Sequence, residues 1–201
     1  RCLDLFEVPL NKGIVAPPGL DPIFRTTQDT MVDLPYVVLY MSPLVAPCLA
    51  KVLAVREQLE KELPHTIVIA GPGLAEEPVD WGGRVVRIEY LPDNHLAGLY
   101  QHGSAFIYPG LHDGAGYAVL EAMGAGLPVV AAKSGALQEV AKDIPIYYNP
   151  SSSDSLLQGT RRVLGFSKGE RAQRVHLGQS ATSNYTWEKS AWKLMSALQR
   201  L

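Results

Sequence analysis

Short apolar runs alternate along the chain with longer stretches in which apolar residues recur at helical spacing. The runs have the length and the β-branched or aromatic content of buried strands, and they lie at 34–41, 65–71, 84–90, 104–109, 127–132 and 144–148. Helical spacing predicts helices over 47–63, 93–103, 117–124, 136–141, 152–165, 168–184 and 187–201. This alternation predicts an α/β fold: a Rossmann-like parallel sheet with helices on both faces. Ligands of such sheets bind outside the carboxyl ends of the strands.

The most informative stretch is 109–126, which reads PGLHDGAGYAVLEAMGAG and joins a predicted strand to a predicted helix. Its glycines, Gly114 and Gly116, allow a tight turn and a close approach of a ligand to the backbone. The helix that follows begins with unpaired N–H groups and a positive dipole end, which suits a phosphate. From these residues alone, a strand-to-helix connection that binds nothing is an equally good interpretation.

Composition narrows the class of protein. The 201 residues suit one domain with an appendage, and a net charge of −2 without a basic run gives no support to nucleic-acid binding. Cys2 and Cys48 are far apart, so we expect neither a disulfide framework nor a zinc site, and a cytoplasmic location. No apolar run approaches the roughly 20 residues of a membrane-spanning helix. No His, Cys or acidic residues show metal-ligand spacing, and we predict no metal.

Four segments resemble, in the same order, the pattern of family 4 retaining glycosyltransferases of the GT-B fold, also called glycosyl transferases group 1. Residues 113–129, DGAGYAVLEAMGAGLPV, are similar to the signature E-G-F-G-x-x-x-x-E-A-M-A-x-G-x-P-V. The other segments are 14–24 (IVAPPGLDPIF), 134–140 (SGALQEV) and 185–191 (YTWEKSA). The resemblance implies the C-terminal, donor-binding half of a GT-B fold. Residues 1–24 would be the tail of an N-terminal domain and the interdomain hinge, and 25–201 the nucleotide-sugar-binding domain with C-terminal helices.

The resemblance also implies an activity. Such an enzyme is a hexosyltransferase: it moves a hexose from a UDP- or GDP-linked sugar to a saccharide or lipid acceptor. The N-terminal domain of the fold holds the acceptor, so the isolated chain would be inactive, and any contact with a membrane would be made by that missing half. The nucleotide sugar is a substrate, and neither a cofactor nor a metal is expected.

The family's site residues can be carried over by position. The transferred sugar would lie on Gly114, Ala115 and Gly116, with Asp113 as the catalytic side chain beside the reacting carbon. The phosphates would face Tyr117 and Ala118, the ribose would bind Glu121, and the base would lie against Tyr90 and Leu91.

Other interpretations of three of these residues stay open. Glu121 could form an internal salt bridge or a cap, because an unpaired buried carboxylate is costly. Asp113 stands where the family has glutamate, is one methylene shorter, and could simply stabilise the turn. Tyr90 could belong to the core.

A larger departure follows the first strand. The family carries Gly-Arg and a later lysine there, and these cations neutralise the leaving diphosphate. This chain has Ser42 and Pro43 in the first two places and no lysine in the third, with Lys51 about one helical turn late. We take Ser42 and Lys51 as the candidates for this role. The departure also favours an alternative, a degenerate, non-catalytic interaction domain of the same fold. A third possibility is a nucleotide-sugar epimerase on the same architecture.

Overall fold

The structure is a computed structural model, and it describes residues 13–33, 35–42, 49–71, 83–111 and 116–199. In these residues six parallel strands form one sheet in the order β3-β2-β1-β4-β5-β6. The strands are β1 (Tyr36–Tyr40), β2 (Thr66–Ala70), β3 (Val85–Ile88), β4 (Ala105–Tyr108), β5 (Val129–Ala132) and β6 (Ile146–Tyr148). The order reverses between β1 and β4, the place where sheets of this kind open a ligand crevice.

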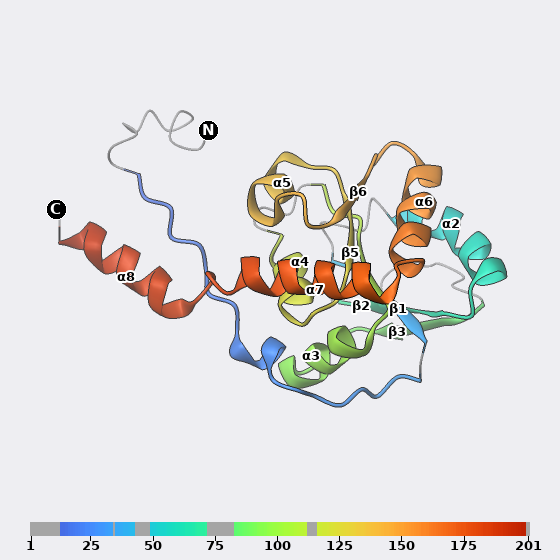
Figure 1. Cartoon of the computed structure of the whole chain (residues 1–201), viewed down its shortest axis with the longest axis horizontal. Helices are drawn as coiled ribbons and strands as arrows, with labels where there is room; N and C mark the ends of the chain where they lie inside the picture. The colour runs from blue at the N-terminus through green and yellow to red at the C-terminus, as the bar shows by residue number, and fades with distance from the viewer. Residues whose placement is uncertain (1–12, 34, 43–48, 72–82, 112–115, 200–201) are drawn as a thin grey trace.

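Helices cover both faces of the sheet, as the sequence predicts (Figure 1). They are η2 (Pro22–Arg25, a short 3₁₀ helix), α2 (Leu49–Glu62), α3 (Asp93–His102), α4 (Tyr117–Gly124), α5 (Gly135–Ala141), α6 (Ser153–Leu164), α7 (Lys168–Thr182) and α8 (Trp187–Leu198). The helices α2 and α6 pack together over one face, and η2, α3 and α4 cover the other, with α7 against α4. The Rossmann-like fold class predicted from the sequence is therefore confirmed.

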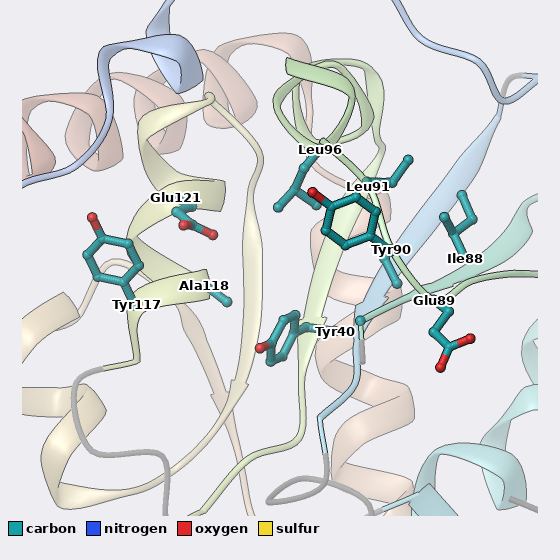
Figure 2. A pocket seen from close by; sticks show the side chains of 11 residues that line it. Tyr40, Ile88, Glu89, Tyr90, Leu91, Leu96, Tyr117, Ala118 and Glu121 are labelled. Carbon is teal, nitrogen blue, oxygen red and sulfur yellow. The ribbon is translucent and has the colours of Figure 1, made fainter. Parts of the chain in front are cut away.

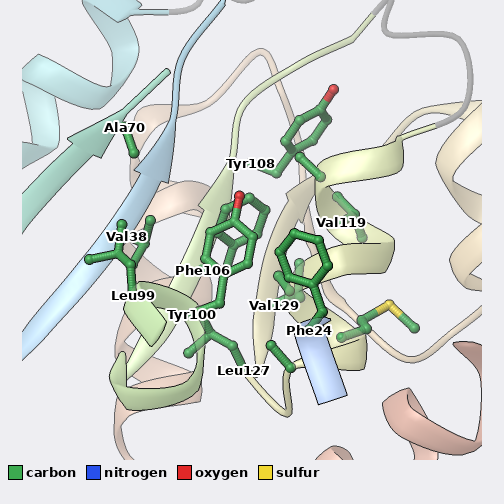
Figure 3. Close-up of a cluster of buried hydrophobic side chains, with 14 of the residues drawn as sticks. Phe24, Val38, Ala70, Leu99, Tyr100, Phe106, Tyr108, Val119, Leu127 and Val129 are labelled. Carbon is green, nitrogen blue, oxygen red and sulfur yellow. The ribbon is translucent and has the colours of Figure 1, made fainter. Parts of the chain in front are cut away.

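Two apolar cores explain why the strands read as unbroken apolar runs. In β1, Val37 and Leu39 point to the α2 and α6 side, whereas Tyr36 and Val38 point to the α3 and α4 side, and all four are buried. Figure 3 shows the second of these cores, in which α3, α4 and η2 pack on the sheet. A strand that is buried on both faces has no polar positions to alternate with its apolar ones.

A row of aromatic rings runs through this second core. Phe24 of η2 stacks on Tyr100 of α3 with 6.0 Å between ring centroids, and Tyr100 meets Phe106 edge-on at 5.2 Å. Phe106 is followed by Tyr108 at 6.3 Å, and Tyr108 by Tyr40 at 6.1 Å. The row ends at Tyr40, the last residue of β1, and so reaches the carboxyl edge of the sheet.

Helix α8 projects from the sheet domain beside the linker that precedes η2 (Figure 1). Thr186 caps it by accepting a hydrogen bond from the Lys189 amide at 3.3 Å, and Lys193 Nζ donates to the Val15 carbonyl at 3.3 Å. Its apolar stripe is nevertheless exposed: 50% of Leu194 and 63% of Leu198 face solvent. A stripe of this kind is typical of a helix that packs against a core, and no described residue covers it.

We therefore expect Leu194→Ala and Leu198→Ala to change the free energy of unfolding by less than about 0.5 kcal/mol, as exposed substitutions do. Urea denaturation measures this change. Leu157→Ala is the control, because the same substitution at the buried Leu157 of α6 must destabilise the chain. A loss above about 1 kcal/mol in either α8 variant would show that the stripe is covered.

Candidate functional site

A cavity of about 400 Å³ lies at the carboxyl ends of β1, β2 and β3, between them and helices α3 and α4 (Figure 2). Its position is the one that a parallel sheet predicts for a ligand. The described residues that line it are Tyr40, Ala70, Gly71, Ile88, Glu89, Tyr90, Leu91, Leu96, Tyr117, Ala118 and Glu121.

Gly71 lets the ends of β1 and β2 approach each other beneath the cavity. Its φ is +138°, and a Cβ built on it would overlap the backbone carbonyl oxygen of Met41. Its own N–H donates to the carbonyl of Ile88 at 3.0 Å, which holds the end of β3 in place. Only glycine combines this φ with this close contact.

Gly116 makes the turn into α4. Its φ is +58°, and a Cβ there would overlap the Leu137 side chain of α5. The amides of Val119 and Leu120 donate to its carbonyl at 2.9 and 3.2 Å. The two amides before them, those of Tyr117 and Ala118, have no acceptor among the described residues, as is usual at a helix start.

Tyr117 belongs both to the cavity and to the linker. Its ring lines the cavity, and its hydroxyl donates a hydrogen bond to the Gly19 carbonyl, 98 residues earlier in the chain. Burial raises the pKa of this hydroxyl, with a further contribution from the negative charge of Glu121.

Glu121 is the polar centre of the cavity. It lies in the middle of α4, and Figure 2 shows its carboxylate directed away from the helix axis into the space that Tyr40 and Leu96 border. No described residue forms an ion pair or a hydrogen bond with this carboxylate, so the internal salt bridge or cap considered above is not found in this part of the chain. Burial raises the pKa of Glu121 to about 8, and the charges of Asp93 and Asp21 add to this effect. A partly buried acid with a strongly raised pKa in a cleft is typical of a functional site.

The opposite wall is aromatic and apolar. Tyr90 is 82% exposed, so it is not a core residue, and it borders the cavity together with Leu91 and Tyr40. Glu89 and Glu121 are the charged residues in the described part of the lining, and both are acidic. This part of the cavity therefore offers surfaces for an apolar ring and an acceptor for hydroxyl groups, with no cation for a phosphate.

The structure thus brings five of the residues singled out from the sequence to one cavity: Tyr90, Leu91, Tyr117, Ala118 and Glu121. Gly116 lies immediately before α4, and Ser42, nearly buried, lies two residues after β1. Lys51 lies in α2, and its side chain is outside the described part of the structure, as are Asp113, Gly114 and Ala115 entirely. Among the described residues no group of His, Cys, Asp and Glu could hold a metal ion, and no helix is long and apolar enough to cross a membrane.

Six lining residues were not predicted: Tyr40, Ala70, Gly71, Ile88, Glu89 and Leu96. Five of them could have been found, because each lies at or just after the carboxyl end of a predicted strand. Leu96 could not, since an apolar residue at helical spacing is equally typical of a core position.

The fold and the cavity define a Rossmann-like domain with a pocket at the carboxyl edge of its sheet. Residues 38–165 match the family Glycosyl transferases group 1, so the chain belongs to this family of transferases, and the resemblance seen in its sequence is confirmed. Among curated relatives, the O-antigen chain mannosyltransferase B of Escherichia coli is 24% identical over 151 residues, which are 71% of this chain and 39% of the relative.

Solved structures agree on the fold. A sucrose-phosphate synthase from Thermosynechococcus elongatus superposes with a TM-score of 0.72 at 18% identity, over 92% of this chain and 51% of that one. An α,α-trehalose-phosphate synthase (UDP-forming) from Burkholderia xenovorans, solved with glucose-6-phosphate, has a TM-score of 0.65 at 16% identity, over 82% and 44%. The chain therefore spans about half the length of these proteins, or less, and has the Rossmann-like architecture of the GT-B type.

Proposed function

We propose that the chain is the donor-binding domain of a retaining hexosyltransferase whose donor is a nucleoside diphosphate sugar. The observation that carries this proposal is the Glu121 carboxylate, which faces a cavity at the carboxyl edge of the sheet without a donor among the described residues. A ribose presents two adjacent hydroxyl donors, and a carboxylate has two oxygens to accept them in strong, charge-assisted hydrogen bonds. The ligand would thus supply the partners that Glu121 lacks.

The rest of the nucleotide fits the same cavity. The base would lie against Tyr90 and Leu91, which give it aromatic and apolar contact. The diphosphate would face the start of α4, where the amides of Tyr117 and Ala118 and the positive end of the helix attract an anion. The similarity to the UDP-forming trehalose-phosphate synthase supports UDP as the nucleotide of the donor. The similarity to the mannosyltransferase supports a hexose as the transferred sugar.

The reacting sugar would lie beyond the phosphates, on Gly114, Ala115 and Gly116, with Asp113 beside it. The bond between the sugar and the phosphate oxygen breaks, and the acceptor hydroxyl forms a new bond on the same face of the sugar. The hydroxyl's proton passes to the leaving phosphate. In this scheme the donor assists its own transfer, and neither a protein nucleophile nor a metal takes part.

A second, N-terminal half would hold the acceptor. The proposal is supported by the chain's span of about half of the proteins it matches, and by the apolar stripe on α8, which no described residue covers. We expect the isolated chain to bind nucleotide and to transfer no sugar. Transfer by this chain alone, followed with a radiolabelled donor, would contradict this division of labour.

Titration calorimetry with UDP, GDP and ADP, without added metal, tests the donor site. One nucleotide should bind, and Glu121→Ala should weaken that binding by about 10- to 100-fold, because hydrogen bonds to a charged group contribute about 1.5–3 kcal/mol. Glu139→Ala, at an exposed acid of α5, is the matched control and should bind as the wild type does. Equal binding by the wild type and Glu121→Ala would refute the proposed ribose contact.

The acidic lining favours a second candidate, a degenerate domain that binds a partner protein and catalyses nothing. Glu89 and Glu121 offer no countercharge to a leaving diphosphate, and Pro43 stands where the family carries arginine. In other enzymes, the loss of one comparable group lowers the rate by about 10²- to 10³-fold. Absence of binding for every nucleotide, with or without the N-terminal half, would favour this candidate.

A further inference from the structure

Tyr100 carries a buried hydroxyl for which the structure shows no partner. The residue lies in α3 and is 0% exposed, and no described group accepts or donates a hydrogen bond at its oxygen. Most buried polar groups are hydrogen-bonded, and a hydroxyl that is not bonded needs a reason. A second tyrosine of the same core, Tyr36, shows the usual situation: its hydroxyl donates to the Leu99 carbonyl at 2.9 Å.

The ring of Tyr100 is held in one orientation by its neighbours. Phe24 stacks on it at 6.0 Å, and Phe106 meets it edge-on at 5.2 Å with a 70° angle between the ring planes. Figure 3 shows the side chain running from α3 toward the end of the sheet where Tyr108 lies. This is the carboxyl edge of the sheet, and Leu96, one turn earlier on α3, lines the cavity there.

The polar groups that interact electrostatically with the Tyr100 hydroxyl belong to residues that line the cavity. After burial itself, the charge of Glu121 and the hydroxyl of Tyr40 are the causes that raise the pKa of Tyr100. Both residues line the cavity. The unpaired donor of Tyr100 thus interacts electrostatically with a carboxylate that has no donor among the described residues.

We propose that Tyr100 is a positioning residue for Glu121: its hydroxyl donates a hydrogen bond to the ionised carboxylate and orients it toward the ligand. The proposal rests on the proposed function, in which Glu121 accepts hydrogen bonds from the ribose. A charged acceptor forms a shorter and stronger hydrogen bond than a neutral one, so the pair forms when Glu121 loses its proton. One carboxylate can accept from Tyr100 and from a ribose together, because its two oxygens have about four acceptor positions.

Three other groups around Glu121 do not provide this help. Asp93 at the start of α3 and Asp21 before η2 oppose its ionisation, and Tyr117, one turn earlier in α4, donates its hydroxyl to Gly19. A donor fixed from below is therefore what the site needs to hold a charged carboxylate in a single orientation.

Tyr100→Phe tests the proposal, because it removes the oxygen and keeps the ring. With ¹³C-labelled glutamate, the carboxyl carbon of Glu121, assigned with Glu121→Gln, can be followed by NMR against pH. We expect the midpoint to rise by about 0.5 to 1 pH unit in Tyr100→Phe, because a donor to the charged form is lost. The affinity for the nucleotide that binds the wild type should fall by about 5- to 10-fold. Tyr36→Phe is the matched control and should change neither quantity.

Thermal denaturation separates positioning from a structural role. The Tm is compared below the Glu121 midpoint, where the pair with Tyr100 is not formed. There Tyr36→Phe loses a formed hydrogen bond and should lower the Tm, whereas Tyr100→Phe removes an unpaired buried hydroxyl and should leave the Tm unchanged or higher. An unchanged Glu121 midpoint in Tyr100→Phe overturns the proposal, whether or not any nucleotide binds. Unchanged affinity in a wild type that does bind nucleotide also overturns it. A raised midpoint in a chain that binds no nucleotide supports the pair and refutes the nucleotide function.

Discussion

The free energy of unfolding of the wild-type chain is expected to fall as the pH rises from 5 to 9, and a Glu121→Gln variant should lose most of this dependence. The pKa of Glu121 is about 8 in the folded chain and ordinarily 4.5, so between these values the folded state holds a proton that the unfolded state releases. Stability is then highest at low pH and is lost as the pH rises toward 8. The loss amounts to about 2 to 4 kcal/mol, somewhat less than the full shift implies because the cavity is open to water.

Urea denaturation at pH 5, 7 and 9 measures this effect. Glu139→Gln is the control. Glu139 is exposed on α5, and its substitution removes the same charge from the chain as Glu121→Gln does. His65 acts in the opposite direction in the acid range, because burial lowers its pKa, but it is present in all three proteins. The difference between variants therefore isolates Glu121, and parallel curves for the wild type and Glu121→Gln would disprove its burial as an unpaired acid.

Replacing Gly71 by alanine should destabilise the chain by about 3 to 5 kcal/mol, the sum of an unfavourable φ and a steric overlap. The added Cβ would overlap the Met41 carbonyl, which is backbone and cannot rotate away, at a φ of +138°. The ends of β1 and β2 would have to separate, and this movement would distort the part of the cavity that they line.

Gly135→Ala is the matched control. Gly135 begins α5, its φ is ordinary for an L residue, and a Cβ there would meet no atom within 4 Å. Alanine should stabilise this position by about 0.5 kcal/mol, because it restricts the unfolded chain. Chemical denaturation of both variants checks the pair, and a Gly71→Ala loss below about 1 kcal/mol would mean that the strand ends adjust freely.

The features that can be predicted from the sequence are those that depend on residues nearby in the chain. The strands can be predicted from local pattern. A run such as that of β1 is apolar on both faces, so it is recognised as a strand without knowing which strands lie beside it. Glu121 could be singled out because an acid among Leu120, Ala122 and Met123 is out of place in a buried helix. Leu96 could not, since an apolar residue at helical spacing is equally typical of a core position.

The unpredicted parts depend on contacts that are distant in the chain. Tyr90 is exposed and the hydroxyl of Tyr100 is unpaired. Both features depend on how the segments that carry these residues pack against other elements of the fold. The stripe on α8 has the pattern of a packed helix and yet lies open, because spacing reports an apolar face and not what covers it. The roles given to Ser42, Lys51 and Asp113 stay predictions.

The hydrogen bond from Tyr117 to Gly19 connects the wall of the cavity to the linker that precedes η2. A ligand that displaces the Tyr117 ring must also pull on the linker, and a linker that swings must move the ring. Energetic coupling between two sites is reciprocal, so a force on one end of this contact acts equally on the other. A single phenol group thus ties two segments 98 residues apart in the chain to each other.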